Sequence, residues 1–194
     1  MENILLIGAN GGIGSSIKKT LSSSYNLDSF GSEQLDLSND NSVKNFILRK
    51  KQKYNHVIFS AGINNLIPYE KISKKSLIHT LEVNIINFLL LLPPLIKYNL
   101  DRSNSSIILI SSLYSFFGRK NRLPYVISKH ALNGACKTLA IELGKKNIRV
   151  NSISPGFIKT KLTEKNLSNK EVINIRKKIP LGDLGKPEDI ANLT

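Results

Sequence analysis

Residues 3–14, NILLIGANGGIG, decide the fold of this chain. The apolar run at residues 4–7 has the length and composition of a buried strand, and a glycine-rich turn at 8–14 and an amphipathic run at 15–21 follow it directly. This order brings free backbone amides and the positive end of a helix to one point, where a pyrophosphate binds well. The segment predicts a nucleotide site at the end of the first strand, with a plain tight turn as the alternative.

The rest of the chain repeats the alternation of strand and helix. Strand-like runs at residues 4–7, 57–60, 107–110 and 150–153 are separated by helical stretches, and 41% of the 194 residues are hydrophobic. This pattern predicts a single α/β domain, residues 1–194, with a Rossmann-like doubly wound parallel sheet. The apolar run at 85–96 contains Pro93 and Pro94 and falls short of the roughly 20 residues that span a membrane. We expect a buried helix there, and no membrane partner.

Tyr125 and Lys129 are four residues apart on an expected helix, so their side chains share one face. A nearby ammonium favours the ionised phenol and is expected to lower the pKa of Tyr125 from about 10 towards neutral pH. The hydroxyl of Ser112, upstream, would hold an oxygen on which charge develops. The spacing alone is weak evidence, because a chain with 6 Tyr and many Lys can contain a Tyr-x-x-x-Lys pair by chance. The pair indicates a function only together with the glycine turn.

With both motifs in view, the chain resembles the short-chain dehydrogenase/reductase family almost from end to end. Its glycines fit the family's Gly-x-x-x-Gly-x-Gly turn, although Ile7 stands where a Thr is usual. The segment 60–62, SAG, matches the family's Asn-Ala-Gly with Ser60 in place of Asn. Asn84 matches a helix Asn that supports a water relay to the catalytic Lys. The segment 149–156, RVNSISPG, with Thr160 beyond it, is similar to the family segment beside the nicotinamide.

The resemblance implies an NAD(P)-dependent oxidoreductase that passes a hydride between a nicotinamide and a ketone or secondary alcohol, such as a sugar derivative, a 3-ketoacyl compound or a small metabolite. Tyr125 is then the general acid or base, Ser112 orients the carbonyl oxygen, Lys129 holds the ribose and Asn84 supports proton resupply. The implied cofactor contacts are Gly8, Asn10, Gly11, Gly12, Ile13, Gly14, Ser32, Asp36, Leu37, Ser60, Ala61, Gly62, Tyr125, Lys129, Pro155, Gly156, Ile158 and Thr160.

The choice between NAD and NADP depends on the end of the second strand, where an acid binds the ribose hydroxyls and repels a 2′-phosphate. An ungapped count reaches Ser32, which does not exclude NADP. Glu33 is adjacent, and Asp28 would serve in another strand register, so NAD stays open and NADP is slightly favoured. Residues 24–40 are also few, so the second helix of the usual family pattern is expected to be absent.

The family pattern also implies a substrate lid at about residues 156–180 and a homodimer or homotetramer built on helices that begin near Lys74 and Pro124. A typical relative continues beyond Thr194 with one more strand. We therefore expect an unpaired sheet edge at residues 149–153, which favours association, poor stability and weak activity. Either the sequence is a fragment or truncated product, or another subunit covers the edge. A dinucleotide-binding subunit or redox sensor with little or no turnover is the alternative function.

The net charge of +14 and the pI near 9.9 raise the possibility of a nucleic-acid partner. The basic residues are scattered in pairs without aromatic interleaving, which favours solvated helix faces and no nucleic-acid partner. Three His and one Cys show no metal-ligand spacing, so no metal site is expected. The beginning of the chain lacks the basic start of an export signal, and a cytoplasmic protein is expected.

Overall fold

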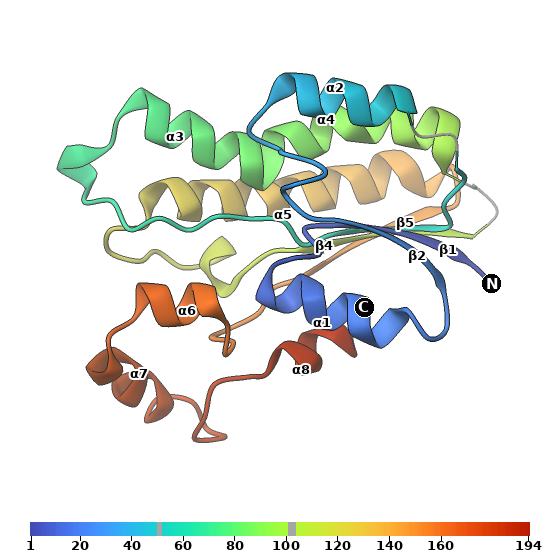
Figure 1. Cartoon of the computed structure of the whole chain (residues 1–194). Coiled ribbons are helices and arrows are strands. Elements are labelled where there is room, and N and C mark those ends of the chain that lie inside the picture. The colour runs from blue at the N-terminus through green and yellow to red at the C-terminus, as the bar shows by residue number, and fades with distance from the viewer. Residues whose placement is uncertain (50–51, 101–103) are drawn as a thin grey trace.

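A five-stranded parallel sheet forms the centre of the computed structural model, which describes residues 1–49, 52–100 and 104–194 (Figure 1). The strand order is β2-β1-β3-β4-β5. Ile7 lies opposite Phe30 of β2 and Phe59 of β3, so the carboxyl ends of these strands meet at one edge. The strands are β1 (Asn3–Ile7), β2 (Asn26–Phe30), β3 (His56–Phe59), β4 (Ser105–Ile110) and β5 (Ile148–Ile153).

Helices cover both faces of the sheet, as the alternating pattern predicts (Figure 1). One face carries α2 (Asp40–Arg49), α3 (Lys74–Leu81), α4 (Asn87–Pro94) and α5 (Leu123–Gly144), and the other carries α1 (Gly12–Leu21) and α8 (Pro187–Ala191). Leu5 belongs to the core on the first face and Leu6 to the core on the second, since successive side chains of a strand point to opposite faces. The α/β doubly wound class is thereby confirmed.

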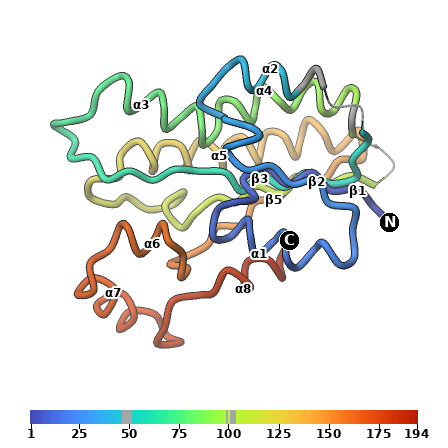
Figure 2. The backbone as a smooth tube through the Cα atoms, in the orientation of Figure 1, coloured from blue at the N-terminus to red at the C-terminus, as the bar shows by residue number. Residues whose placement is uncertain are grey.

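The chain leaves β5, passes through α6 (Lys161–Asn166) and α7 (Asn169–Arg176), and returns to place α8 beside α1 (Figure 2). The helices α6 and α7 therefore lie beyond the carboxyl end of β5. Ile158 forms an isolated parallel bridge with Gly185, which joins the start and the end of this excursion. We keep the name lid for residues 156–180.

Residues Lys74–Tyr98 form 25 residues of almost uninterrupted helix with mean hydropathy 1.5, long and apolar enough to cross a membrane by length and composition alone. The run includes the π-turns η2 (Glu82–Ile86) and η3 (Leu95–Asn99). Phe88 and Leu91 are fully buried in the core, and the ring of Phe88 stacks on Phe59 of β3 at 4.2 Å between centroids. The predicted helix is therefore present but buried only in part, because Phe88 and Leu91 pack in the core while Leu90 is 59% exposed. The short 3-10 helices are η1 (Tyr69–Lys71) and η4 (Leu113–Ser115).

The second strand differs most from the sequence expectations. The sequence of β2, NLDSF, has no apolar run because the strand lies at a sheet edge. Asp28 lies mid-strand opposite Leu5 and accepts a 2.7 Å hydrogen bond from Tyr54 Oη. The alternative in which Asp28 binds the ribose is therefore wrong. No helix lies in residues 31–39 between β2 and α2, as expected. At the other edge β5 pairs only with β4 within the described ranges.

Candidate active site

Two glycines close the turn that follows β1. Gly8 has φ +92°, in the region that favours glycine, and a Cβ there would overlap the backbone of Ala61. A Cβ on Gly14 would overlap the carbonyl oxygen of Gly8. The turn is anchored to the neighbouring strand, because the amides of Gly8 and Ala9 both donate to the Phe30 carbonyl at 2.8 and 3.0 Å. Any residue other than glycine at these two positions would therefore push the main-chain segments apart. We call this turn, residues 8–14, the phosphate cradle.

The ten-residue helix α1 begins at this turn. Its N-cap, Gly11, provides no side-chain hydrogen bond, and its first turn contains no acidic residue. The first amides of the helix are therefore left for a ligand, and the helix dipole favours an anion there. Gly12 packs against Thr160 of the lid, so the phosphate cradle and the lid are in contact. The cradle fits a dinucleotide pyrophosphate.

A cavity of about 370 Å³ extends from the glycine turn to the end of β2. It brings together half of the residues expected to contact the cofactor. Asp36 accepts hydrogen bonds from the amide and hydroxyl of Ser38, at 2.8 and 2.7 Å, and these bonds lower the pKa of its carboxyl. The expected residues that line this cavity are Gly8, Asn10, Gly11, Ser32, Asp36, Leu37, Ser60, Ala61 and Gly62.

A second, smaller cavity of about 100 Å³ lies beyond the carboxyl end of β4. Ser112 follows β4 and caps η4, accepting a hydrogen bond from the Tyr114 amide at 3.2 Å, and Tyr125 lies in the first turn of α5. The structure thus brings together the two hydroxyls that are thirteen residues apart in the sequence. The expected residues that line this cavity are Ile13, Ser112, Tyr125, Pro155, Gly156, Ile158 and Thr160.

The phenol of Tyr125 has a raised pKa because burial disfavours its charged form. A hydrogen bond with Ser112 and the charge of Arg122 act in the opposite direction without reversing the shift. The net shift is therefore upward, and the expectation that the pKa of Tyr125 moves down towards neutral pH is wrong. Lys129 Nζ lies 5.7 Å from the centroid of the Tyr125 ring and donates to the Ile110 carbonyl at 2.9 Å, and burial lowers its own pKa to about 8.

Asn84 lies in the π-turn η2 and is fully buried. Its side-chain amide accepts from the Ile63 amide at 2.8 Å, donates to the Ile63 carbonyl at 3.0 Å and donates to Ser128 Oγ at 2.9 Å. The amide therefore ties the segment after β3 to α5, one residue from Lys129. An extra residue in a helical turn is often found at functional positions, and here it aims Asn84 at this junction.

The sequence analysis missed the side chains that complete the smaller cavity. Arg122 precedes α5, Tyr114 belongs to η4, Asn64 follows β3, and Phe157 and Asn166 come from the lid. One signal for Arg122 was available, because it stands three residues before Tyr125 and so on the same side of a helical turn. Tyr114 and Phe157 are close in sequence to the expected residues Ser112 and Gly156, and Asn166 falls in the predicted lid, whereas no local spacing indicates Asn64.

A sequence-family model described as enoyl-(acyl carrier protein) reductase matches residues 13–194. The 3-oxoacyl-(acyl-carrier-protein) reductase of Rickettsia felis is 31% identical over 207 residues, covering 97% of this chain and 85% of the relative. The same-named enzyme of Thermotoga maritima is 31% identical over 162 residues, 82% of this chain, and the match spans 65% of that relative's length.

Solved structures share the fold over the whole chain. A short chain dehydrogenase family protein from Francisella tularensis has a TM-score of 0.87 at 26% identity, with 100% of this chain and 89% of the other covered. A 4-hydroxyisoleucine dehydrogenase complexed with NADH has a TM-score of 0.86 at 32% identity, with the same coverage. The chain therefore belongs to the short-chain dehydrogenase/reductase family of oxidoreductases.

Proposed function

We propose that this chain reduces a small carbonyl compound to a secondary alcohol with a nicotinamide dinucleotide. The observation that carries the proposal is the convergence of Ser112, Tyr125 and the buried Lys129 at the end of β4, next to a glycine cradle suited to a pyrophosphate. A bound nicotinamide dinucleotide would supply the hydride. The residues around the cradle would hold its phosphates and ribose, and the cavity beside Tyr125 would hold the substrate carbonyl.

The side chains divide the work at the carbonyl. Tyr125 donates its phenolic proton to the carbonyl oxygen, while Ser112 hydrogen-bonds that oxygen and holds it in place. Lys129 is placed by its bond to the Ile110 carbonyl, within reach of the same buried region, and would hold a ribose hydroxyl. Asn84 is a positioning residue, since its hydrogen bonds fix the segment at Ile63 against α5.

The raised pKa of Tyr125 favours the reductive direction near neutral pH. A phenol is protonated at every pH below its pKa, so burial extends the range in which Tyr125 can donate a proton. Oxidation needs the phenolate and so requires a higher pH. We expect the rate of carbonyl reduction to stay level through neutral pH and to fall only in alkaline buffer.

We favour NADP as the cofactor. Ser32, at the end of β2, lines the larger cavity with a small neutral side chain, and a 2′-phosphate meets no charge repulsion from it. Among the described residues, Asp36 is the acid that lines this cavity, and its carboxylate is held by Ser38. Ratios of kcat/KM for NADPH and NADH test this choice, and a preference for NADH would overturn it.

We also propose a homodimer through α3, α4 and α5. These helices expose large apolar side chains, including Leu90 at 59% and Ile141 at 79%. Light scattering at micromolar concentration should give the dimer mass, and Leu90→Glu should shift it towards the monomer. A strictly monomeric wild-type mass would contradict the proposal.

The test of the proposed function is Tyr125→Phe, assayed by nicotinamide absorbance over a panel of ketones. Turnover should fall by at least about 10²-fold, since the proton donor is lost, while cofactor affinity measured by nicotinamide fluorescence stays unchanged. The matched control is Tyr69→Phe, because Tyr69 is 74% exposed and lines neither of the two cavities. Cofactor binding without turnover by the wild-type chain would instead favour the silent subunit or sensor.

A further inference from the structure

Arg122 has a buried guanidinium inside the substrate cavity. It immediately precedes α5, only 4% of its surface is exposed, and it lines the same cavity as Ser112 and Tyr125. Arginine is almost never buried to this extent without a partner. Its place one turn before the proposed proton donor puts a permanent positive charge where a substrate would bind.

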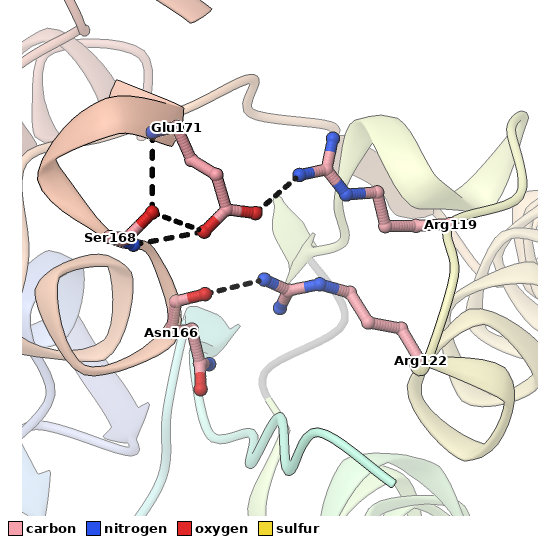
Figure 3. A network of polar contacts seen from close by, with 5 residues as sticks. All are labelled: Arg119, Arg122, Asn166, Ser168 and Glu171. Carbon is pink, nitrogen blue, oxygen red and sulfur yellow. Dashed lines mark hydrogen bonds and ion pairs between the residues drawn. The ribbon is translucent and has the colours of Figure 1, made fainter. Parts of the chain in front are cut away.

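No carboxylate forms an ion pair with Arg122 within the described part of the chain, although the charge of Glu171 acts on the guanidinium from a longer distance. Among residues 1–49, 52–100 and 104–194, its hydrogen-bond partner is the Asn166 carbonyl, at a long 3.4 Å from Nη2. Figure 3 shows the nearby acid, Glu171, turned to other groups: it pairs with Arg119 at 3.5 Å and accepts from the Ser168 amide and hydroxyl. A guanidinium offers five N–H donors, so most of those of Arg122 remain available.

Tyr114 adds a second polar group without a partner. Its Oη is buried and makes no hydrogen bond, and the side chain lines the same cavity at 7% exposure. The Arg122 guanidinium carbon lies 5.9 Å from the centroid of the Tyr114 ring, so the two side chains are neighbours. A buried hydroxyl without a partner is costly unless a ligand supplies one. A phenol and a guanidinium side by side form a donor set for an oxyanion.

A purely structural role for Arg122 would be to fasten the lid to α5 through Asn166. The neighbouring pair of Arg119 and Glu171 already makes such a connection, with opposite charges and at the surface. A single long bond to a neutral carbonyl oxygen does not offset the desolvation of a buried guanidinium. Arg122 is therefore better explained by a ligand than by the lid.

We propose that the substrate is a small oxo acid whose carboxylate pairs with Arg122 and accepts a hydrogen bond from Tyr114 Oη. This assignment deepens the proposed function and rests on it. The carbonyl carbon takes a hydride, the carbonyl oxygen takes the proton of Tyr125, and the carboxylate is unchanged. A planar guanidinium binds a carboxylate with two parallel hydrogen bonds. Neutral sugars and thioesters would leave the charge unpaired, and the cavity of about 100 Å³ suits a molecule of few carbons.

The experiment compares acids with their own methyl esters, so that the carbon skeleton and the position of the ketone are kept while the charge is removed. In pyruvate the ketone is bonded directly to the carboxylate. One CH₂ group separates the two in acetoacetate, and two separate them in levulinate. For at least one pair, wild-type kcat/KM should be at least tenfold higher for the acid. Arg122→Gln should lower kcat/KM for that acid by about 10²-fold, the size expected for an unpaired buried charge, and change the ester by less than about threefold.

Two further variants separate binding from folding. Arg122→Lys keeps a point charge and should keep part of the preference for the acid. Arg119→Gln removes the neighbouring surface arginine and should leave the preference unchanged, because Arg119 does not line this cavity. Esters reduced as well as acids by the wild type, or a preference that survives Arg122→Gln, would overturn the carboxylate assignment while the proposed reductase stands.

If no ketone is reduced, the proposed function fails and the carboxylate site is tested by binding alone. The melting temperature of the cofactor-saturated chain is then measured with excess levulinate and with excess methyl levulinate. A rise with the acid only, lost in Arg122→Gln, supports the site. An equal rise with both compounds, or no rise with either, refutes it.

Discussion

The two halves of the site are built in different ways. The cofactor half is made mainly of backbone: Gly8 and Gly14 allow main-chain atoms to meet, and the turn amides are tied to Phe30. The substrate half is made of side chains from separate segments, and two buried polar atoms among its described residues lack partners, Tyr114 Oη and Asn64 Oδ1. The cofactor half therefore depends on backbone geometry that glycines and a helix terminus allow, whereas the substrate half depends on side chains from segments that are distant in the sequence.

The largest expected effect breaks the cofactor half. Gly8→Ala should lower the free energy of unfolding by about 2 to 6 kcal/mol, because φ of +92° strains any side chain and the added Cβ meets the Ala61 backbone. Denaturant unfolding measures the loss, and nicotinamide fluorescence should show weakened cofactor binding. The matched control is Gly118→Ala, where nothing lies within 4 Å of the new methyl group. Equal losses for the two variants would refute the close approach at Gly8.

The next effect tests Lys129, where the two halves meet. An exposed lysine has a pKa of about 10.4, and burial lowers that of Lys129 to about 8 in the folded chain. Between these values the unfolded chain holds a proton that the folded chain has lost, so folding is favoured as pH rises. Below pH 8 Lys129 is charged in the folded chain as well, so the full cost of burying its charge lowers the free energy of unfolding. Relative to Lys129→Met, the wild type should gain about 2 to 3 kcal/mol between pH 8 and 10.4.

Denaturant titrations of wild type and Lys129→Met at several pH values measure this gain. Other titrating groups are common to both chains, so they cancel in the difference. A difference that stays constant across the window would show that Lys129 keeps an ordinary pKa in the folded chain.

A smaller effect is expected on cofactor preference, at Ser32 in the larger cavity. Ser32→Asp should shift the ratio of kcat/KM for NADPH over NADH about tenfold towards NADH, because a carboxylate repels a 2′-phosphate and accepts hydrogen bonds from a ribose. Ser32→Ala, which removes the hydroxyl without adding charge, should shift the ratio much less. An unchanged ratio in the Asp variant would place the ribose elsewhere.

The smallest effect concerns the rim of the substrate half. Arg119→Gln should cost less than about 1 kcal/mol in thermal or denaturant unfolding, since its ion pair with Glu171 is partly exposed on both sides. A larger loss would mean that this pair, and not the packing of the lid, holds the C-terminal helices over the sheet.

Sequence reasoning reached the fold and the cofactor turn because both rest on local patterns. An apolar run followed by glycines leads to a strand and a helix start wherever it occurs, and the spacing of Tyr125 and Lys129 fixes a shared helix face. The prediction for the pKa of Tyr125 failed because burial outweighs the neighbouring charges, and burial depends on the whole chain. The edge strand β2 has no apolar run, so only a residue count from the glycine turn, which reached Ser32, indicated where it ends; the strand ends at Phe30.

The sequence by itself determined a parallel α/β sheet, a dinucleotide cradle after β1 and the proximity of Tyr125 to Lys129. Only the tertiary structure decided which groups surround them. Arg122 meets Asn166 across 44 residues and Asn166 meets Asn64 across 102. Glu171 forms its ion pair with Arg119 and not with Arg122. This choice depends on where the lid places its side chains. Local pattern fixes backbone geometry, whereas the pairing of buried charges is settled by distant segments that fold together.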